Sequence, residues 1–162
     1  MRASPPPRIR PASLADHEAL SRLWAQVDAL HARVRPDYFR ASSGEPRSRL
    51  ELEELLAARD SVVLVGVVDE QVVGLVEVSL HDTPRDPHLA ERRRAHVVDL
   101  VVDQALRRRG IGSDLMGAAV SWARQRGATD VVLTVWAGNS EAEAFYRSLG
   151  YEPICRVLGG PV

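Results

Sequence analysis

An arginine-rich turn with two closely spaced glycines is the segment best suited to chemistry. Residues 107–113 read Arg-Arg-Arg-Gly-Ile-Gly-Ser and lead into an apolar helical stripe. The first turn of a helix leaves backbone N–H groups without partners and carries positive partial charge. Glycine lets a ligand approach the backbone, and arginine pairs with phosphate oxygens. The turn therefore predicts a site for a phosphate-bearing carrier, formed by Arg107, Arg108, Arg109, Gly110, Ile111, Gly112 and Ser113.

The spacing of this turn does not fit the common nucleotide-binding motifs. A dinucleotide-binding turn has the pattern G-x-G-x-x-G, and Leu115 stands where the third glycine would be. A P-loop requires a lysine, and all 21 basic residues of the chain are arginine. A nucleotide-phosphate binder of another fold and a solvated basic turn stay open as alternatives.

The elements around the turn alternate between strand and helix patterns. Residues 96–102 and 131–136 are rich in valine, as strands are, and the helix that begins at the turn lies between them. A strand, a helix and a second strand form a βαβ unit, which binds its ligand at the carboxyl end of the first strand. Another helix follows from Asn139 to Leu149, and residues 154–158 predict a last strand.

The first half of the chain predicts helices and then a hairpin. A strand is expected near Ile9, and a helix capped by Ser13 fades before Pro36. A second helix is expected to begin near Pro46. Residues 62–68 and 71–80 then predict two antiparallel strands, although the turn between them lacks glycine.

Composition narrows the class of protein. The 162 residues predict a single domain over 1–162, with residues 1–8 flexible. The net charge of -1 gives no general attraction for nucleic acid or for an anionic membrane, so neither is expected as a partner. One cysteine, Cys155, and the absence of a signal peptide favour a cytoplasmic location. His81 and Asp82 have no partner at metal-ligand spacing, so no metal is expected.

Two motifs in order resemble the GNAT (GCN5-related) N-acetyltransferase superfamily. Asp99-Leu100-Val101-Val102-Asp103 followed by R-x-x-G-x-G at 107–112 is similar to the acyl-CoA signature of that family. Residues 139–151 are similar to its N-x-x-A-x-x-F-Y-x-x-x-G-F segment, with Tyr151 where phenylalanine is common. The match is strong over residues 96–151 and looser over residues 9–80.

The resemblance implies an α/β (α+β) fold with a mixed, mostly antiparallel central sheet flanked by helices. Two central strands are expected to splay apart and admit acetyl-CoA. In the family pattern, the backbone of Leu100, Val101 and Val102 pairs with the pantetheine arm, and the N–H groups of residues 108–113 hold the pyrophosphate. Asn139 is expected near the arm and Tyr146 near the sulfur.

The implied reaction is direct attack of an amine on the thioester of acetyl-CoA. The amine can belong to a small molecule, a peptide or a protein, and the product is an N-acetyl group. Tyr146 is expected to donate a proton to the departing thiolate, and the base is Asp99 or Glu77, with His96 as a further candidate. A non-catalytic acyl-CoA-binding sensor stays open as the alternative function, and a homodimer as a possible assembly.

The acceptor is expected to bind near the first two helices and the loop between them. Asp28, His31, Tyr38 and Phe39 combine polar and aromatic groups there. The charged stretch 82–94 is either a loop that closes over the substrate or a solvated face.

Overall fold

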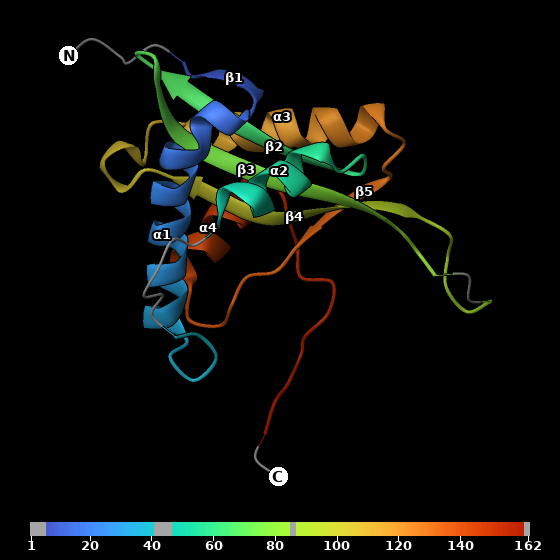
Figure 1. The fold of residues 1–162 in the computed structure, drawn as a ribbon. Helices are drawn as coiled ribbons and strands as arrows, with labels where there is room; N and C mark the ends of the chain where they lie inside the picture. The colour runs from blue at the N-terminus through green and yellow to red at the C-terminus, as the bar shows by residue number, and fades with distance from the viewer. Residues whose placement is uncertain (1–5, 41–46, 85–86, 161–162) are drawn as a thin grey trace.

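A five-stranded sheet runs through the molecule, with helices on both of its faces (Figure 1). The computed structural model describes residues 6–40, 47–84 and 87–160. Four strands pair antiparallel in chain order and the last pairs parallel to the fourth, which confirms the predicted mixed sheet. The strands are β1 (Arg8–Pro11), β2 (Ser61–Val68), β3 (Gln71–Asp82), β4 (Arg93–Val102) and β5 (Asp130–Leu133).

The helices form one layer on each face of the sheet. They are η1 (Leu14–Asp16), α1 (His17–Val34), α2 (Arg49–Ala57), η2 (Gln104–Leu106), α3 (Ile111–Gln125) and α4 (Ser140–Ser148). Leu20, Leu23 and Trp24 of α1 are fully or almost fully buried against one face, together with Leu52 of α2. Helix α3 packs its apolar stripe on the other face, where side chains of α4 join it. The sheet therefore separates two apolar cores.

The start of α1 follows the predicted capping signal, whereas the cap of α2 was not predicted. Ser13 and Asp16 form a capping box before α1, and the Ser13 N–H donates to the Asp16 carboxylate at 2.8 Å. Arg10 also pairs with Asp16 through both terminal guanidinium nitrogens, Nη1 and Nη2, each at 2.8 Å, which links β1 to this helix. Ser48 caps α2, so that helix begins at Arg49. Pro46, where its start was expected, lies outside the described residues.

The turn between β2 and β3 forms without glycine. Asp69 and Glu70 have φ angles of 48° and 62°, the left-handed conformation that a two-residue hairpin turn needs at both central positions. Acidic residues adopt this conformation at a cost of about 1 to 2 kcal/mol each. Pairing of Val68 with Gln71 sets the register, and the predicted hairpin is confirmed.

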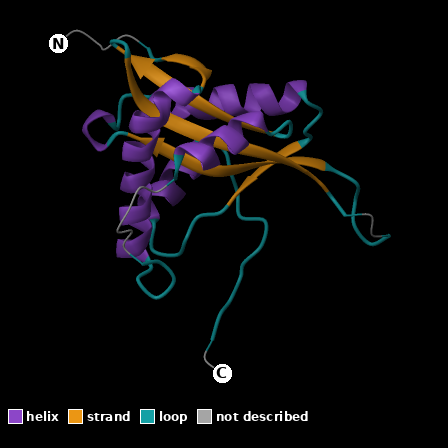
Figure 2. Cartoon of the chain, viewed as in Figure 1, coloured by secondary structure: helices purple, strands orange, loops and turns teal. Residues whose placement is uncertain are grey.

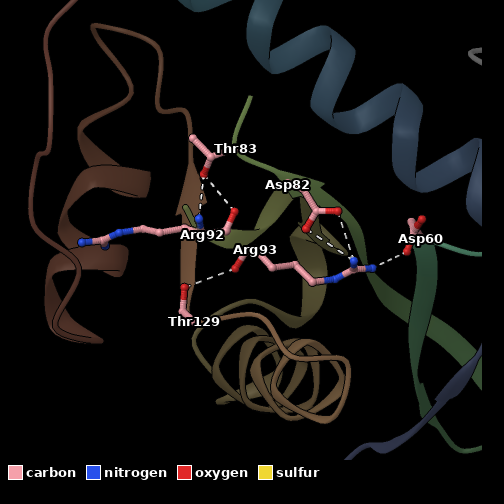
Figure 3. A network of polar contacts seen from close by, with 6 residues as sticks. All are labelled: Asp60, Asp82, Thr83, Arg92, Arg93 and Thr129. Carbon is pink, nitrogen blue, oxygen red and sulfur yellow. Dashed lines mark hydrogen bonds and ion pairs between the residues drawn. The ribbon is translucent and has the colours of Figure 1, made fainter. Parts of the chain in front are cut away.

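The hairpin of β3 and β4 extends beyond the rest of the sheet, and polar contacts hold its two strands together where they leave it (Figures 1 and 3). The Thr83 N–H donates to the Arg92 carbonyl at 2.8 Å, and the Thr83 hydroxyl oxygen accepts from the Arg92 N–H at 3.1 Å. Arg93 reaches Asp60 and Asp82 on neighbouring strand ends. The two strands thus continue through residues 82 and 93, and the connection is shorter than the expected charged loop 82–94.

Three details of the predicted elements are wrong. Residues 154–158 lie in no strand, because no strand within the described residues pairs with them (Figure 2). Strand β5 ends at Leu133 instead of reaching residue 136. The chain start was expected to be flexible over residues 1–8, but Arg8 already belongs to β1 and pairs with Val67 of β2. Residues 1–5 lie outside the described part.

Candidate functional site

Strands β4 and β5 separate after Val97, and a cavity of 1230 Å³ opens between them. Their parallel register ends at Val97 and Leu133, whereas β4 continues to Val102 beside β3. Residues 98–102 therefore line the cavity with the side of their backbone that faces away from β3. Such an edge can pair with an extended ligand as an added strand would.

The cavity gathers most of the residues that the sequence singled out. Its lining includes His31, His96, Asp99, Leu100, Val101, Val102, Arg107, Arg108, Gly110, Ile111, Gly112, Ser113, Asn139 and Tyr146. Five predicted site residues do not line it: Asp28, Tyr38, Phe39, Glu77 and Arg109. Arg109 was expected among the carrier-binding residues, but of the three arginines in the turn only Arg107 and Arg108 line the cavity.

The turn before α3 presents its backbone to the cavity. Arg108 and Gly110 have φ angles of 64° and 83°, so the chain folds back tightly before the helix starts. The first hydrogen bond of α3 runs from the Asp114 N–H to the Gly110 carbonyl at 3.0 Å. The N–H groups of residues 111–113 precede that bond and have no helical acceptor. Together with the helix dipole they form an anion site.

Arg107 and Arg108, the two arginines of the turn that line the cavity, make only weak contacts with the rest of the protein. Arg107 donates to the Val102 carbonyl at 3.2 Å, and both Arg107 and Arg108 lie 3.8 Å from carboxylate oxygens of Glu141 in α4. Arg108 and Glu141 are largely exposed, so these ion pairs contribute little stability. A phosphate group can therefore replace Glu141 as the partner of the guanidinium groups.

Tyr146 projects from α4 into the cavity. Its ring packs edge-on against Phe145 and Tyr151, with centroids 5.2 and 6.0 Å away. Burial, followed by the charges of Tyr151 and Asp99, raises the pKa of Tyr146 to about 12. The hydroxyl consequently keeps its proton at physiological pH and is available as a donor.

Glu77 and Asp99 face each other across β3 and β4. Their side chains are 11% and 12% exposed, and the Arg47 guanidinium lies 3.2 Å from Glu77 and 3.0 Å from Asp99. Burial raises the pKa of Glu77, and Arg47 opposes that shift. Asp28 of α1 is close enough for burial and the charge of Asp99 to raise its pKa. Only Asp99 of these three carboxylates lines the cavity.

Aromatic side chains gather where α1 ends beside the cavity. Phe39 stacks on His31 with centroids 4.8 Å apart and meets the edge of Trp136 at the same distance. Tyr38 is 60% exposed and lies 5.3 Å from Trp136, so it borders this cluster from the solvent side. His31 and Trp136 line the cavity itself. The site thus has an aromatic wall beside the end of α1.

Comparison with known proteins identifies the family. The model of the acetyltransferase (GNAT) family matches residues 20–151, which include the carrier turn, Asp99 and Tyr146. The chain belongs to the GNAT acetyltransferase family. The enzymes of this family are acetyl-CoA-dependent acyltransferases.

Individual relatives agree in sequence or in fold. A variant of the BH1408 protein from Bacillus halodurans is 30% identical, covers 96% of this chain and 99% of its own, and superimposes with a TM-score of 0.91. An aminoglycoside N-acetyltransferase, AAC(6')-Iy in complex with CoA, shares the fold with a TM-score of 0.73 at 17% identity over 96% of this chain and 98% of its own. Human N-acetyltransferase 8 is 34% identical over 97 residues, 60% of this chain. The chain spans only 41% of the length of that human relative.

Sequence reasoning did not find three residues of this GNAT site. Arg47 falls at the predicted start of the second helix, where nothing in its neighbours indicates that it reaches the sheet. Trp136 was expected inside a strand, and Trp24 inside the helix capped by Ser13. Local patterns place these residues on their elements but do not indicate their distant partners, so only the folded chain reveals their part in the site.

His96 is a weaker candidate for the base of a GNAT reaction. It lines the cavity, and its ring centroid lies 6.2 Å from that of His81. Burial first, and the charge of His81 second, lower the pKa of His96, so its neutral form is favoured. A neutral imidazole can accept a proton, but His96 lies opposite Val132, where β4 and β5 are still paired.

Two further properties concern the described parts of the chain. Their His, Cys, Asp and Glu side chains form no group of three that could hold a metal ion. None of their helices combines the length and the hydropathy that a membrane-spanning helix needs.

Proposed function

We propose that the chain is an N-acetyltransferase that moves the acetyl group of acetyl-CoA to an amine of a small molecule, a peptide or a protein. The observation that carries the proposal is the order of groups along one cavity. The anion-binding turn follows the end of β4, the open edge at residues 100–102 precedes that turn, and Asp99 precedes the open edge, while Tyr146 lines the same cavity. This order matches the pyrophosphate, the extended arm and the thioester of acetyl-CoA.

The carrier would be held mainly by backbone groups. N–H groups of residues 108–113 and the guanidinium groups of Arg107 and Arg108 would bind the pyrophosphate. The edge of β4 at residues 100–102 would pair with the amide groups of the pantetheine arm. The Asn139 side-chain oxygen caps α4 by accepting from the Ala142 N–H at 3.1 Å, which leaves its NH₂ group to donate to the arm.

The reaction would proceed by direct attack while both substrates are bound. Asp99, directly or through water, takes a proton from the acceptor ammonium, and the amine lone pair attacks the thioester carbon. The C–N bond forms, and a backbone N–H near Val101 or Val102 stabilises the negative oxygen. As the C–S bond breaks, Tyr146 donates a hydrogen bond and then its proton to the leaving sulfur, and the second proton of the attacking nitrogen returns to the Tyr146 oxygen through water, which leaves the amide, the thiol and a neutral tyrosine.

Acetyl-CoA should stabilise the protein, whereas ATP and NAD should not. At 100 times its dissociation constant, a ligand adds about 2.7 kcal/mol to the free energy of unfolding. For a chain of this size the melting temperature should rise by about 5 to 10 °C. Differential scanning fluorimetry with the three ligands in parallel measures the shift. A larger shift with ATP or NAD would contradict the proposed carrier.

Matched glycine variants locate the carrier site. A Cβ at residue 112 would lie 3.2 Å from Phe145 and 3.7 Å from Val102, so the side chain of Gly112→Gln would fill the space at the start of α3. Gly117 lies on the same helix with open space around it. Gly112→Gln should therefore abolish the shift with acetyl-CoA, and Gly117→Gln should retain it. Retention in both variants would place the carrier elsewhere.

The exposed C-terminal segment supports a homodimer as part of the proposal. Val157 and Leu158 are 93% and 90% exposed, and Ile154 is 74% exposed. Burial of such a side chain stabilises by about 1.5 to 3 kcal/mol. Light scattering should give twice the chain mass for the wild type and the single mass for a Val157→Asp, Leu158→Asp double variant. A wild-type monomer at micromolar concentration would remove the dimer from the proposal.

A further inference from the structure

Arg47 lies directly before the cap of α2 and reaches across to the sheet. Its Nη2 donates to Asp99 Oδ2 at 3.0 Å, and its Nη1 lies 3.2 Å from Glu77 Oε2. The guanidinium carbon stacks 4.2 Å from the centroid of the Trp24 ring. The backbone is held too, because the Arg47 carbonyl lies 3.0 Å from His17 Nε2. Three contacts of the guanidinium and one of the backbone thus fix where this charge lies.

The stack on Trp24 gives the guanidinium a rigid support. Trp24 is 1% exposed and belongs to the core between α1 and the sheet. Arginine stacks on aromatic faces and presents its donors in a planar fork, which suits two carboxylates at once. Lysine offers a single flexible ammonium and matches neither feature. The geometry therefore uses properties that only arginine has.

Glu77 and Asp99 need a cation between them. They are directly opposite in the register of β3 and β4, where two like charges destabilise the pairing. Both carboxylates are nearly buried, so each also loses hydration. Within the described residues, Arg47 is the only cation in an ion pair with either of them. Without it, at least one carboxylate would bind a proton instead.

Other titrating groups face the same charge. Asp28, from α1, has its pKa raised by burial and by Asp99 and lowered by Arg47 and His31. Tyr146, from α4, is affected by the charge of Asp99. Glu77 lies behind the cavity wall, whereas Asp99 is part of it. Arg47 consequently connects the carboxylate that meets substrate to one that does not.

We propose that Arg47 is a positioning residue that holds Asp99 at the cavity wall and keeps the Asp99–Glu77 pair ionised, ready to accept the proton of the acceptor amine. The inference rests on the proposed function. In the step concerned, an N–H bond of the acceptor ammonium breaks, an O–H bond forms on the carboxylate pair, and the nitrogen lone pair becomes free to attack. The guanidinium does not give up its own proton, so it stabilises the ionised pair without acting as the acid.

The pH dependence of turnover tests the role. Arg47→Met keeps much of the side-chain volume and removes the charge; Arg47→Lys keeps a charge without the fork. Loss of an adjacent opposite charge should move the acid limb of kcat/KM up by about 1 to 3 pH units. At a pH below both limbs, kcat/KM then falls about tenfold for each unit of that shift and recovers at higher pH, and Arg47→Lys lies between. Arg94→Met is the matched control, because Arg94 lies on the same strand as Asp99 and forms an ion pair with a different carboxylate, Asp130, at 3.0 Å.

A carboxyl titration followed by ¹³C NMR gives a readout that does not depend on turnover. The Glu77 signal, assigned with Glu77→Gln, should titrate at higher pH in Arg47→Met and Arg47→Lys than in the wild type and Arg94→Met. An unmoved Glu77 titration overturns the inference. A moved titration with an unmoved acid limb overturns the catalytic part of it. If the wild type releases no thiol with any amine of a broad panel, the proposed function fails instead, and the Glu77 titration alone decides whether Arg47 keeps the pair ionised.

Discussion

Tyr146→Phe should lower the turnover number about 100-fold and leave the dissociation constant of acetyl-CoA nearly unchanged. The substitution removes one hydroxyl from the cavity and keeps the ring that packs against Phe145 and Tyr151. A donor to the developing thiolate acts mainly in the transition state, so its loss lowers kcat rather than affinity. Thiol release and isothermal calorimetry measure the two quantities separately.

The pH dependence adds a second test of Tyr146. Its pKa is raised to about 12, so the hydroxyl is protonated across the range in which activity can be measured. A thiol has an ordinary pKa of about 8.5, so the hydroxyl acts first through a hydrogen bond to the leaving sulfur. The wild type should therefore show no alkaline decline from this group below about pH 10. Tyr151→Phe is the control, because Tyr151 packs on the same ring and does not line the cavity. Equal turnover in Tyr146→Phe and the wild type would exclude Tyr146 from proton donation.

Local patterns were sufficient to predict the elements that position the carrier site. The valine-rich strand, the turn at residues 107–113 and the stripe of α3 are contiguous, so period and capping signals describe them directly. The start of α4 is equally local, because the Asn139 side chain accepts from the Ala142 N–H three residues on. These features depend on neighbours a few residues away, and the fold keeps them as the sequence indicates.

Features that depend on distant contacts could not be predicted in this way. Strand β5 ends at Leu133 because the chain leaves β4 there, and this separation opens the cavity. Arg47 acquires its role from partners 23, 30 and 52 positions away along the chain, namely Trp24, Glu77 and Asp99. Residues 154–158 have the composition of a strand, but the described chain provides no neighbour to pair with them. Composition sets the preference of a segment for a strand, and the presence of a strand to pair with decides whether that strand forms.

Asp99→Asn should reduce kcat/KM by about 100-fold to 10,000-fold and remove the acid limb of the pH profile, because the amide cannot take the amine proton. Affinity for acetyl-CoA should hold, since the carrier turn is built from other residues. The effect should exceed that of Arg47→Met, which leaves the carboxylate in place.

The same substitution should not unfold the protein, which separates a catalytic effect from a structural one. Burial and the charge of Asp99 raise the pKa of Glu77, so the folded state binds that proton more tightly than the unfolded chain does. Stability is therefore lost as the pH rises from the unfolded pKa through the raised folded one. Asp99→Asn removes one of the two causes and lets Arg47 serve Glu77 alone, so the melting temperature near pH 8 should equal or exceed that of the wild type. Unchanged turnover with an intact acid limb would instead assign the base to Glu77 or His96, and the variants Glu77→Gln and His96→Gln would then distinguish a buried carboxylate from an imidazole at the cavity wall.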